Sequence, residues 1–446
     1  MERTQERMQV FFCQMSPPQG KGETEIQKDK DSELIRRFHR QMIAYMNRPE
    51  VELENAIPSA TQELGYSYYM QKKRLRDRGM RIHYAKYMDQ PFVYYNFTDD
   101  KKQTVCKMTR AVNYDIRYVR NARVVGSQCR SECVNHYVFR AKNEQGFYTC
   151  PACGAAQPLE ALLDGCDYCK AKFDINAYHD YVACVCGGRA TKYIGKKERE
   201  KRKKNNYKAS IIFGLSFSLI FFIPWMLLNY FSDLATGIKI FMMLLFIGLF
   251  IFSLTLMTGA LIWVSSAQDK AMKRYDSVYD AIRKCNPDFN MEAFAAQMDS
   301  KIKTMFYAKE IKDVSAFVFF DMNAFLLQNQ NVVSCEVNEI DLLNFRTDDT
   351  YQYVDVCRHV CLLRDMGNHL TPESKYLYVT LCKKRNYKIK RDVVMYRCPC
   401  CSASISLKEG GVCQYCAAKL DYTLYDWAIV GMKYGGRPTW VKRNDL

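Results

Sequence analysis

Two uncharged apolar runs near the middle of the chain constrain its fold more than any other feature. Residues 211–228 and 240–264 contain no charged side chain, and a helix needs about 20 apolar residues to cross a bilayer. Neither run shows a polar face at helical spacing, which a soluble core helix would show. Only residues 229–239 separate them, so the chain returns to the side it came from. We predict a transmembrane helical hairpin over 211–264, with a buried soluble helix pair as the alternative.

The charges around these runs predict the orientation of the hairpin. Residues 191–208 carry nine Lys or Arg and two Glu, and Lys270, Lys273 and Arg274 follow the second run. Basic flanks stay on the cytoplasmic side. Residues 1–25 lack a signal-peptide pattern. We therefore expect a multi-pass protein of the cell membrane with both termini in the cytoplasm, and we expect the basic stretch to contact anionic headgroups.

Two cysteine quartets are the second strong feature. Each consists of Cys-x-x-Cys, a spacer and another Cys-x-x-Cys, which places two pairs of thiolates around one tetrahedral Zn²⁺ at about 2.3 Å. Glycines at 165 and at 410–411 precede the second pair, and we expect a small β-hairpin in the spacer. A site of four cysteines has no open position, so the predicted zinc is structural. The predicted ligands are Cys150, Cys153, Cys166 and Cys169 for the first ion, and Cys398, Cys401, Cys413 and Cys416 for the second.

The two quartets are copies of one unit. Tyr148-x-Cys-Pro-x-Cys matches Tyr396-x-Cys-Pro-x-Cys, and Cys166-x-Tyr-Cys-x-Ala-Lys matches Cys413-x-Tyr-Cys-x-Ala-Lys. Helical patterns come before strand patterns ahead of each quartet. We infer that a whole α+β unit is duplicated on the two sides of the hairpin.

Periodicity predicts the elements of each unit. Expected helices span 31–47, capped by Asp31 or Ser32, then 58–78, 269–284, 290–308 and 313–328. Expected strands span 92–97, 104–108, 134–139, 332–337, 351–363 and 375–383. The predicted domains are a disordered tail (1–30), an α+β domain (31–149), zinc ribbon 1 (150–185), a basic linker (186–210), the hairpin (211–264), a helical linker (265–285), a second α+β domain (286–397), zinc ribbon 2 (398–430) and a tail (431–446).

The remaining thiols and imidazoles carry weaker predictions. In a cytoplasmic chain, 20 cysteines favour metal ligation and buried thiols over disulfides. Cys400, inside its knuckle, is expected to be a spare thiol. The pairs Cys129/Cys133 and Cys357/Cys361 are expected to pack in strands or in the core. The imidazoles His136 and His359 lie on strand-like stretches and are expected to be packing residues rather than catalysts. Cys184 and Cys186 are a weaker candidate for a minor metal or redox-sensitive pair.

Several of these motifs resemble those of a known family. An Asn286-Pro287-Asp288-Phe289 helix start, an α+β region, a Cys-Pro-x-Cys ribbon and a Tyr425-Asp426-Trp427 tail together resemble bacterial membrane proteins with a Tim-forty-four-like domain followed by a zinc ribbon. The resemblance covers roughly 277–430. It implies a cone-shaped α+β fold like nuclear transport factor two, with a curved sheet and a pocket, in both predicted domains. It also implies lipid contact and protein tethering rather than catalysis.

The functional prediction combines these points. We expect a membrane-anchored scaffold that presents two α+β domains to a protein partner on the cytoplasmic side. The alternative is a membrane-associated nucleic-acid-binding protein, because the chain has a net charge of +17. Nucleic acid is disfavoured because the charge concentrates beside the membrane. No HExxH, GxSxG or GxxxxGK sequence occurs, so we do not expect an enzyme. Homo-oligomerisation stays open.

Overall fold

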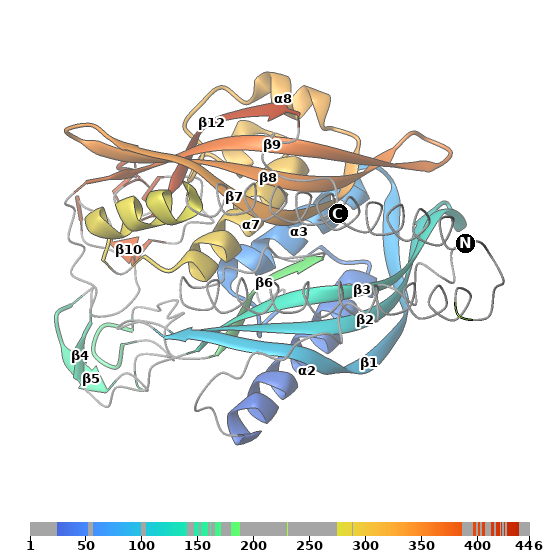
Figure 1. Cartoon of the computed structure of the whole chain (residues 1–446), viewed down its shortest axis with the longest axis horizontal. Helices are drawn as coiled ribbons and strands as arrows, with labels where there is room; N and C mark the ends of the chain where they lie inside the picture. The colour runs from blue at the N-terminus through green and yellow to red at the C-terminus, as the bar shows by residue number, and fades with distance from the viewer. Residues whose placement is uncertain are drawn as a thin grey trace. The chain divides into compact units, whose positions relative to one another are not determined.

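Each half of the chain folds as helices packed on a four-stranded antiparallel sheet (Figure 1). The computed structural model describes residues 25–51, 57–99, 104–140, 147–150, 153–158, 161, 166–170, 180–187, 230, 274–287, 289–385, 396–397, 400–401, 404–405, 412–413, 416–419, 421, 423 and 426–436. The predicted α+β class is confirmed.

The described residues of the first half form two helices and six strands. These are α2 (Glu25–Asn47), α3 (Gln62–Asp77), β1 (Met80–Asp99), β2 (Thr104–Arg120), β3 (Arg123–Arg140), β4 (Phe147–Thr149), β5 (Ala156–Pro158) and β6 (Tyr181–Gly187). The main sheet has the order β1-β2-β3-β6, and β4 pairs with β5 in a small separate hairpin. Strand β6 therefore returns to the sheet only after the chain has formed the cysteine-rich segment.

The second half repeats this plan. Its elements are α7 (Met291–Tyr307), a 3₁₀ turn η1 (Ile311–Asp313), α8 (Asn323–Gln328), β7 (Val332–Thr347), β8 (Tyr351–Asp365), β9 (Leu370–Lys384), β10 (Tyr396–Arg397), β11 (Ser404–Ile405) and β12 (Ala428–Gly435). The main sheet has the order β12-β9-β8-β7, and β10 pairs with β11.

Two irregularities recur at equivalent places and support the inferred duplication. The pairing of β3 with β6 shifts register at Ala183, and the pairing of β9 with β12 shifts at Val430. The residue just before each shift also forms a parallel bridge to the segment that precedes the sheet. Val182 pairs with Ala60, and Ile429 pairs with Val318. Such bulges bend a strand locally and are specific features of a fold.

The helices form where apolar periodicity and a capping side chain coincide. In α7, the Asn290 side chain accepts a hydrogen bond from the N–H of Ala293 at 3.0 Å, which satisfies a free donor of the first turn. Phe294, Met298 and Ile302 are buried along one stripe. In α3, the Thr61 hydroxyl accepts from the N–H of Leu64 at 3.4 Å.

The two halves form one compact unit, although the sequence predicts separate domains. This unit comprises Met1–Ala190 and Ser277–Pro438 with Arg443–Leu446. Helix α3 of the first half packs against α7 of the second (Figure 1). Val333 and Leu363 belong to the same buried apolar cluster as Phe38, Leu64 and other residues of the first half. The domain boundaries predicted above stay predictions.

Arginine side chains make much of the polar contact between the halves. Arg74 of α3 is buried and donates to the carbonyls of Tyr307, Ala308 and Gln330 at 3.3, 2.6 and 2.7 Å. Two of these carbonyls lie at the C-terminal end of α7, where a cation is favoured by the helix dipole.

A second polar contact centres on one carboxylate. Arg78 and Arg120 of the first half both contact Asp365 of β8 at 2.5 Å, and the Asp365 side chain is fully buried. Burial alone raises the pKa of Asp365, but the hydrogen bonds from Arg120 and Arg78 outweigh burial and lower it below its usual value.

The structure corrects several predicted boundaries. Helix α2 begins at Glu25 rather than 31, so Asp31 and Ser32 are buried inside it and do not cap it. The expected helix 313–328 is wrong in its middle, because Val318 bridges to β12 and only Asn323–Gln328 is α-helical. The strands are longer than predicted, since their polar outer ends continue the ladders.

The predicted hairpin, 211–264, lies outside the described residues except for Tyr230. It belongs to a second unit, Thr191–Asp276 with Thr439–Lys442. Within the part of the chain that the structure describes, no helix combines the length and the apolar character needed to cross a bilayer. Residues 1–24 and 437–446 of the predicted tails (1–30 and 431–446) and residues 188–210 of the predicted basic linker (186–210) also lie outside the described residues.

Candidate metal centres

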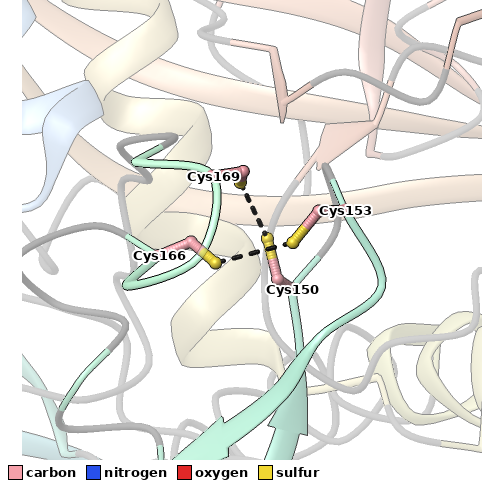
Figure 2. A group of neighbouring side chains, drawn as sticks. All are labelled: Cys150, Cys153, Cys166 and Cys169. Carbon is pink, nitrogen blue, oxygen red and sulfur yellow. Dashed lines mark hydrogen bonds between the residues drawn. The ribbon is translucent and has the colours of Figure 1, made fainter.

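The first cysteine quartet converges on one point. The ligand atoms of Cys150, Cys153, Cys166 and Cys169 lie within 4.8 Å of one another, and Figure 2 shows the four sulfur atoms directed toward a common centre. Cys150 Sγ lies 3.7 Å from Cys169 Sγ, and Cys153 Sγ lies 3.6 Å from Cys166 Sγ. These separations exclude disulfides, whose S–S bond is about 2.05 Å. Four sulfurs at 2.3 Å from a tetrahedral ion would be about 3.8 Å apart, so the quartet can hold a metal ion.

Local backbone geometry creates this convergence. The N–H of Cys150 donates to Ala155 O at 2.7 Å, and the N–H of Gly154 donates back to Cys150 O at 2.8 Å. Gly154 adopts a left-handed conformation with φ 78°. The first Cys-x-x-Cys is therefore closed by a tight turn, and its two thiols face the same side.

The same turn recurs in the other described knuckles without glycine. Lys170 and Ala417 directly follow Cys169 and Cys416, and their φ angles are 58° and 56°. The N–H of Lys170 donates to Cys166 O at 2.7 Å, and the N–H of Ala417 donates to Cys413 O at 2.8 Å. A left-handed residue with a side chain costs roughly 1–2 kcal/mol, so the surrounding turn imposes this conformation.

The thiols of the first quartet differ in acidity. Burial raises the pKa of Cys166, but the backbone N–H groups of Cys169 and Tyr168 outweigh burial and lower it to about 7. The N–H of Ala155 lowers the pKa of Cys153, but desolvation and hydrogen bonds with the other three thiols raise it to about 12. The Cys166 thiol therefore has a lower pKa than the Cys153 thiol, and the thiolate is the form that binds metal.

The second quartet is described in part. The ligand atoms of Cys401, Cys413 and Cys416 lie within 4.8 Å of one another, and Cys401 Sγ is 3.6 Å from Cys413 Sγ. Cys398 lies outside the described residues. The exposed Cys400 is not among these three residues, which agrees with its expected role as a spare thiol.

The short hairpins that the structure describes surround the first knuckle of each ribbon, while much of each spacer between the knuckles lies outside the described residues. Strand β4 precedes Cys150 and β5 follows Cys153, and β10 and β11 flank the first knuckle of the second ribbon in the same way. The physical reason is that the knuckle itself is the tight turn. The glycines 165 and 410–411, expected to supply turns, lie outside the described residues.

A third group was not predicted as a set. Cys184, Cys186 and Asp299 are all buried, with their ligand atoms within 4.8 Å of one another. The hydrogen bond with Cys186, together with burial, raises the pKa of Cys184 well above its usual value. The sequence indicates the two cysteines as a pair. Asp299 lies outside the apolar stripe that predicts its helix, so the sequence carries no signal that it joins them.

The other predicted packing residues are found in the strands. His136 is buried, and its Nε2 lies 2.7 Å from His39 Nε2. His359 Nε2 lies 2.5 Å from Ser374 Oγ. Cys357 is buried and Cys361 half-buried, while the side chains of Cys129 and Cys133 lie outside what the structure describes.

Asp426 and Trp427, from the tail that follows the second ribbon, are anchored on α7. Lys301 Nζ donates to Asp426 Oδ2 at 2.9 Å and to Trp427 O at 2.8 Å. The Trp427 ring packs edge-on against Phe294, with 5.8 Å between ring centroids.

No known protein family, curated protein or solved structure matches the chain.

Proposed function

We propose that the protein is a membrane-anchored, non-catalytic scaffold with two structural zinc ribbons. In this proposal residues 211–264 form a transmembrane hairpin, and the two α+β halves face a protein partner at the cytoplasmic surface of the cell membrane. The observation that carries the proposal is the placement of the cysteine quartets. Each quartet interrupts a sheet between its third and fourth strands, where a closed metal site fixes the path of the chain.

The zinc ions have a structural role in this proposal. A Cys₄ site leaves no coordination position for a substrate or an activated water. Metal binding instead adds directly to the folding free energy of the segment that carries the ligands. The ribbon strands that the structure describes are two and three residues long, and short hairpins of this kind are not stable alone.

The two halves form the presenting surface. Each half, helices on a four-stranded sheet, corresponds in our proposal to one cone-like domain of the Tim-forty-four-like type. Buried contacts through Arg74 and Asp365 join the halves, so a partner would meet one rigid body. Rigid presentation lowers the ordering cost of binding, which suits a tether.

Metal analysis of the purified full-length protein tests the ribbons. We expect the double variant Cys150→Ser/Cys153→Ser to lose one zinc per chain, and Cys413→Ser/Cys416→Ser to lose another. Cys400→Ser is the matched control, because this thiol lies inside a knuckle but outside the predicted ligand set. A wild-type protein without zinc would overturn the proposal, as would full zinc content in both double variants.

A topology experiment tests the membrane anchor. A reporter fused to either terminus is expected to be active on the cytoplasmic side, and the chain is expected to stay in the membrane pellet after carbonate extraction. Deletion of 211–264 should release the chain. A reporter found outside the cell, or an extractable full-length chain, would contradict the anchor.

The basic stretch is tested separately with vesicles. Each Lys or Arg near an anionic surface contributes roughly 1 kcal/mol, and salt screens the attraction. Replacing the nine basic residues of 191–208 by Gln should weaken binding to vesicles that contain anionic lipid and leave binding to neutral vesicles unchanged. Equal binding to both vesicle types by the wild-type chain would contradict the lipid contact, and tight binding to duplex DNA would favour the nucleic-acid alternative.

A further inference from the structure

A buried polar cluster lies where the two halves meet. Cys184 and Cys186 come from β6 of the first half, and Asp299 comes from α7 of the second. Cys184 Sγ is 3.4 Å from Asp299 Oδ2. All three side chains are at most 8% exposed. Chain segments more than a hundred residues apart therefore supply two thiols and a carboxylate to one interior position.

The strand geometry explains why both thiols face this position. Side chains two residues apart on a strand point to the same face, and Cys184 and Cys186 pair across the ladder with Tyr137 and Asn135 of β3. Helix α7 packs against this face of β6. Tyr137 and Ala296 belong to the buried cluster that surrounds the cysteines, so the site is enclosed by apolar and aromatic groups.

Arg358 of β8 completes the cluster. Its guanidinium pairs with Asp299 Oδ1, while Asp299 Oδ2 faces Cys184. One carboxylate oxygen is thus held by a cation and the other is directed at the thiols. This is the way an outer residue orients a carboxylate ligand. Arg358 is 3% exposed, yet its Nε donor finds no acceptor among the described residues.

The charge balance of the cluster favours a divalent cation. With both thiols protonated, the Asp299 carboxylate and the Arg358 guanidinium cancel, and the buried Lys303, which donates to Val185 O at 2.8 Å, adds one positive charge. Exchange of the two thiol protons for one divalent ion leaves the net charge unchanged, because two thiolates compensate the ion. A buried site avoids the large cost of an uncompensated charge in this way. The thiolates would also give the Arg358 Nε–H an acceptor.

We propose that Cys184, Cys186 and Asp299 bind a zinc-class divalent cation that joins the two halves, with Arg358 as the positioning residue. Thiolate ligands select zinc over harder cations such as magnesium. A disulfide is the poorer alternative. Cysteines two apart on a strand have Cα atoms about 6.6 Å apart, near the upper limit for a disulfide, and a disulfide gives Asp299 no role.

Metal content and cobalt spectroscopy of the full-length protein test the proposal. We expect Cys184→Ala/Cys186→Ala to hold one divalent ion per chain fewer than the wild type, whatever the content of the ribbons. Cys335→Ala/Cys357→Ala is the matched control, because it also removes two buried thiols but touches neither quartet nor cluster. It should keep the wild-type content.

A conservative variant keeps the test independent of misfolding. Asp299→Asn preserves shape, and in the cobalt-loaded protein it should shift the thiolate-to-cobalt absorption of one site while the ribbon bands stay unchanged. Arg358→Lys should retain the ion. The proposal is overturned if the Cys184/Cys186 double variant holds as much metal as the wild type, if the control loses as much, or if Asp299→Asn leaves the cobalt spectrum unaltered.

Discussion

Helices α2 and α7 occupy equivalent places in the two halves but differ in the elements that cover them. Helix α2 packs against its own sheet through Leu34, Ile35, Phe38 and Met42. Helix α7 packs against β7 of its own sheet and also against β3, β6 and α3 of the other half. The flank that would face solvent in an isolated half is therefore covered.

The difference appears in the charges of α7. Asp299, Lys301 and Lys303 are all buried, and each has a partner: Arg358, Asp426 and the Val185 carbonyl. Two of these partners lie in the second half and one in the first. The comparison teaches that a helix covered by a second copy can keep buried charges on its polar flank, because groups of its own half pair with most of them.

The largest effect should come from the contact that covers the end of α7. Arg74→Ala leaves three carbonyls at the interface without their donor, and we expect the free energy of unfolding to fall by about 3–5 kcal/mol. Chemical denaturation of the full-length protein measures this. Arg76→Ala, an exposed change on the same helix, should cost less than about 0.5 kcal/mol. Equal losses in the two variants would refute the shared interior.

A smaller but pH-dependent effect should come from the Lys301–Asp426 pair of α7. Burial raises the pKa of Asp426, but the charge of Lys301 outweighs burial and lowers it below the usual 3.8. The stabilisation by the carboxylate is therefore present above the unfolded pKa and is lost as the pH falls through the lowered folded pKa.

The variant Lys301→Met tests the Lys301–Asp426 ion pair and its pH dependence. It leaves Asp426 buried without its cation, and we expect a loss of about 3 kcal/mol at pH 7. The difference from the wild type should shrink as the pH falls. Burial without Lys301 raises the pKa of Asp426 in the variant, so the variant regains stability by protonation first, and the wild type then loses its stabilising carboxylate below pH 3.8. Denaturation curves between pH 7 and pH 2 measure it. A difference that does not change with pH would contradict the pairing.

The smallest effects should distinguish a crowded glycine from an uncrowded one. A Cβ on Gly126 of β3 would lie 2.6 Å from Leu370 Cδ1 and 3.2 Å from Leu370 Cβ, which belongs to the other half. We expect Gly126→Ala to cost about 1 kcal/mol, because Leu370 must move. Gly65 in α3 has open space, so Gly65→Ala should add about 0.5–1 kcal/mol. Thermal midpoints that move in the same direction for both would contradict this packing.

The sequence predicted local features well because their causes are local. The helix over 290–308 is found as Met291–Tyr307, with Asn290 as its cap, since apolar periodicity and a capping side chain lie within a few residues. The thiols of Cys150 and Cys153 meet because a tight turn brings them together.

The joining of the halves could not be predicted in the same way. Arg74 and Asp365 look like ordinary surface charges in the sequence, and their partners lie more than two hundred residues away in the other half. Asp299 gives no signal until α7 is packed against β6. Burial of polar groups by a second copy depends on long-range contacts, which local patterns do not encode.

The interior shared by the two halves also sets an order of events during synthesis. Phe38 and Leu64 leave the ribosome early, but Val333 and Leu363, which pack in the same cluster, follow only after residues 188–276 have been made. Until the second half has been translated, part of the apolar surface of the first half stays exposed to solvent. That interval, between translation of β6 and translation of β8, is when the nascent chain is most exposed to aggregation and most in need of a chaperone.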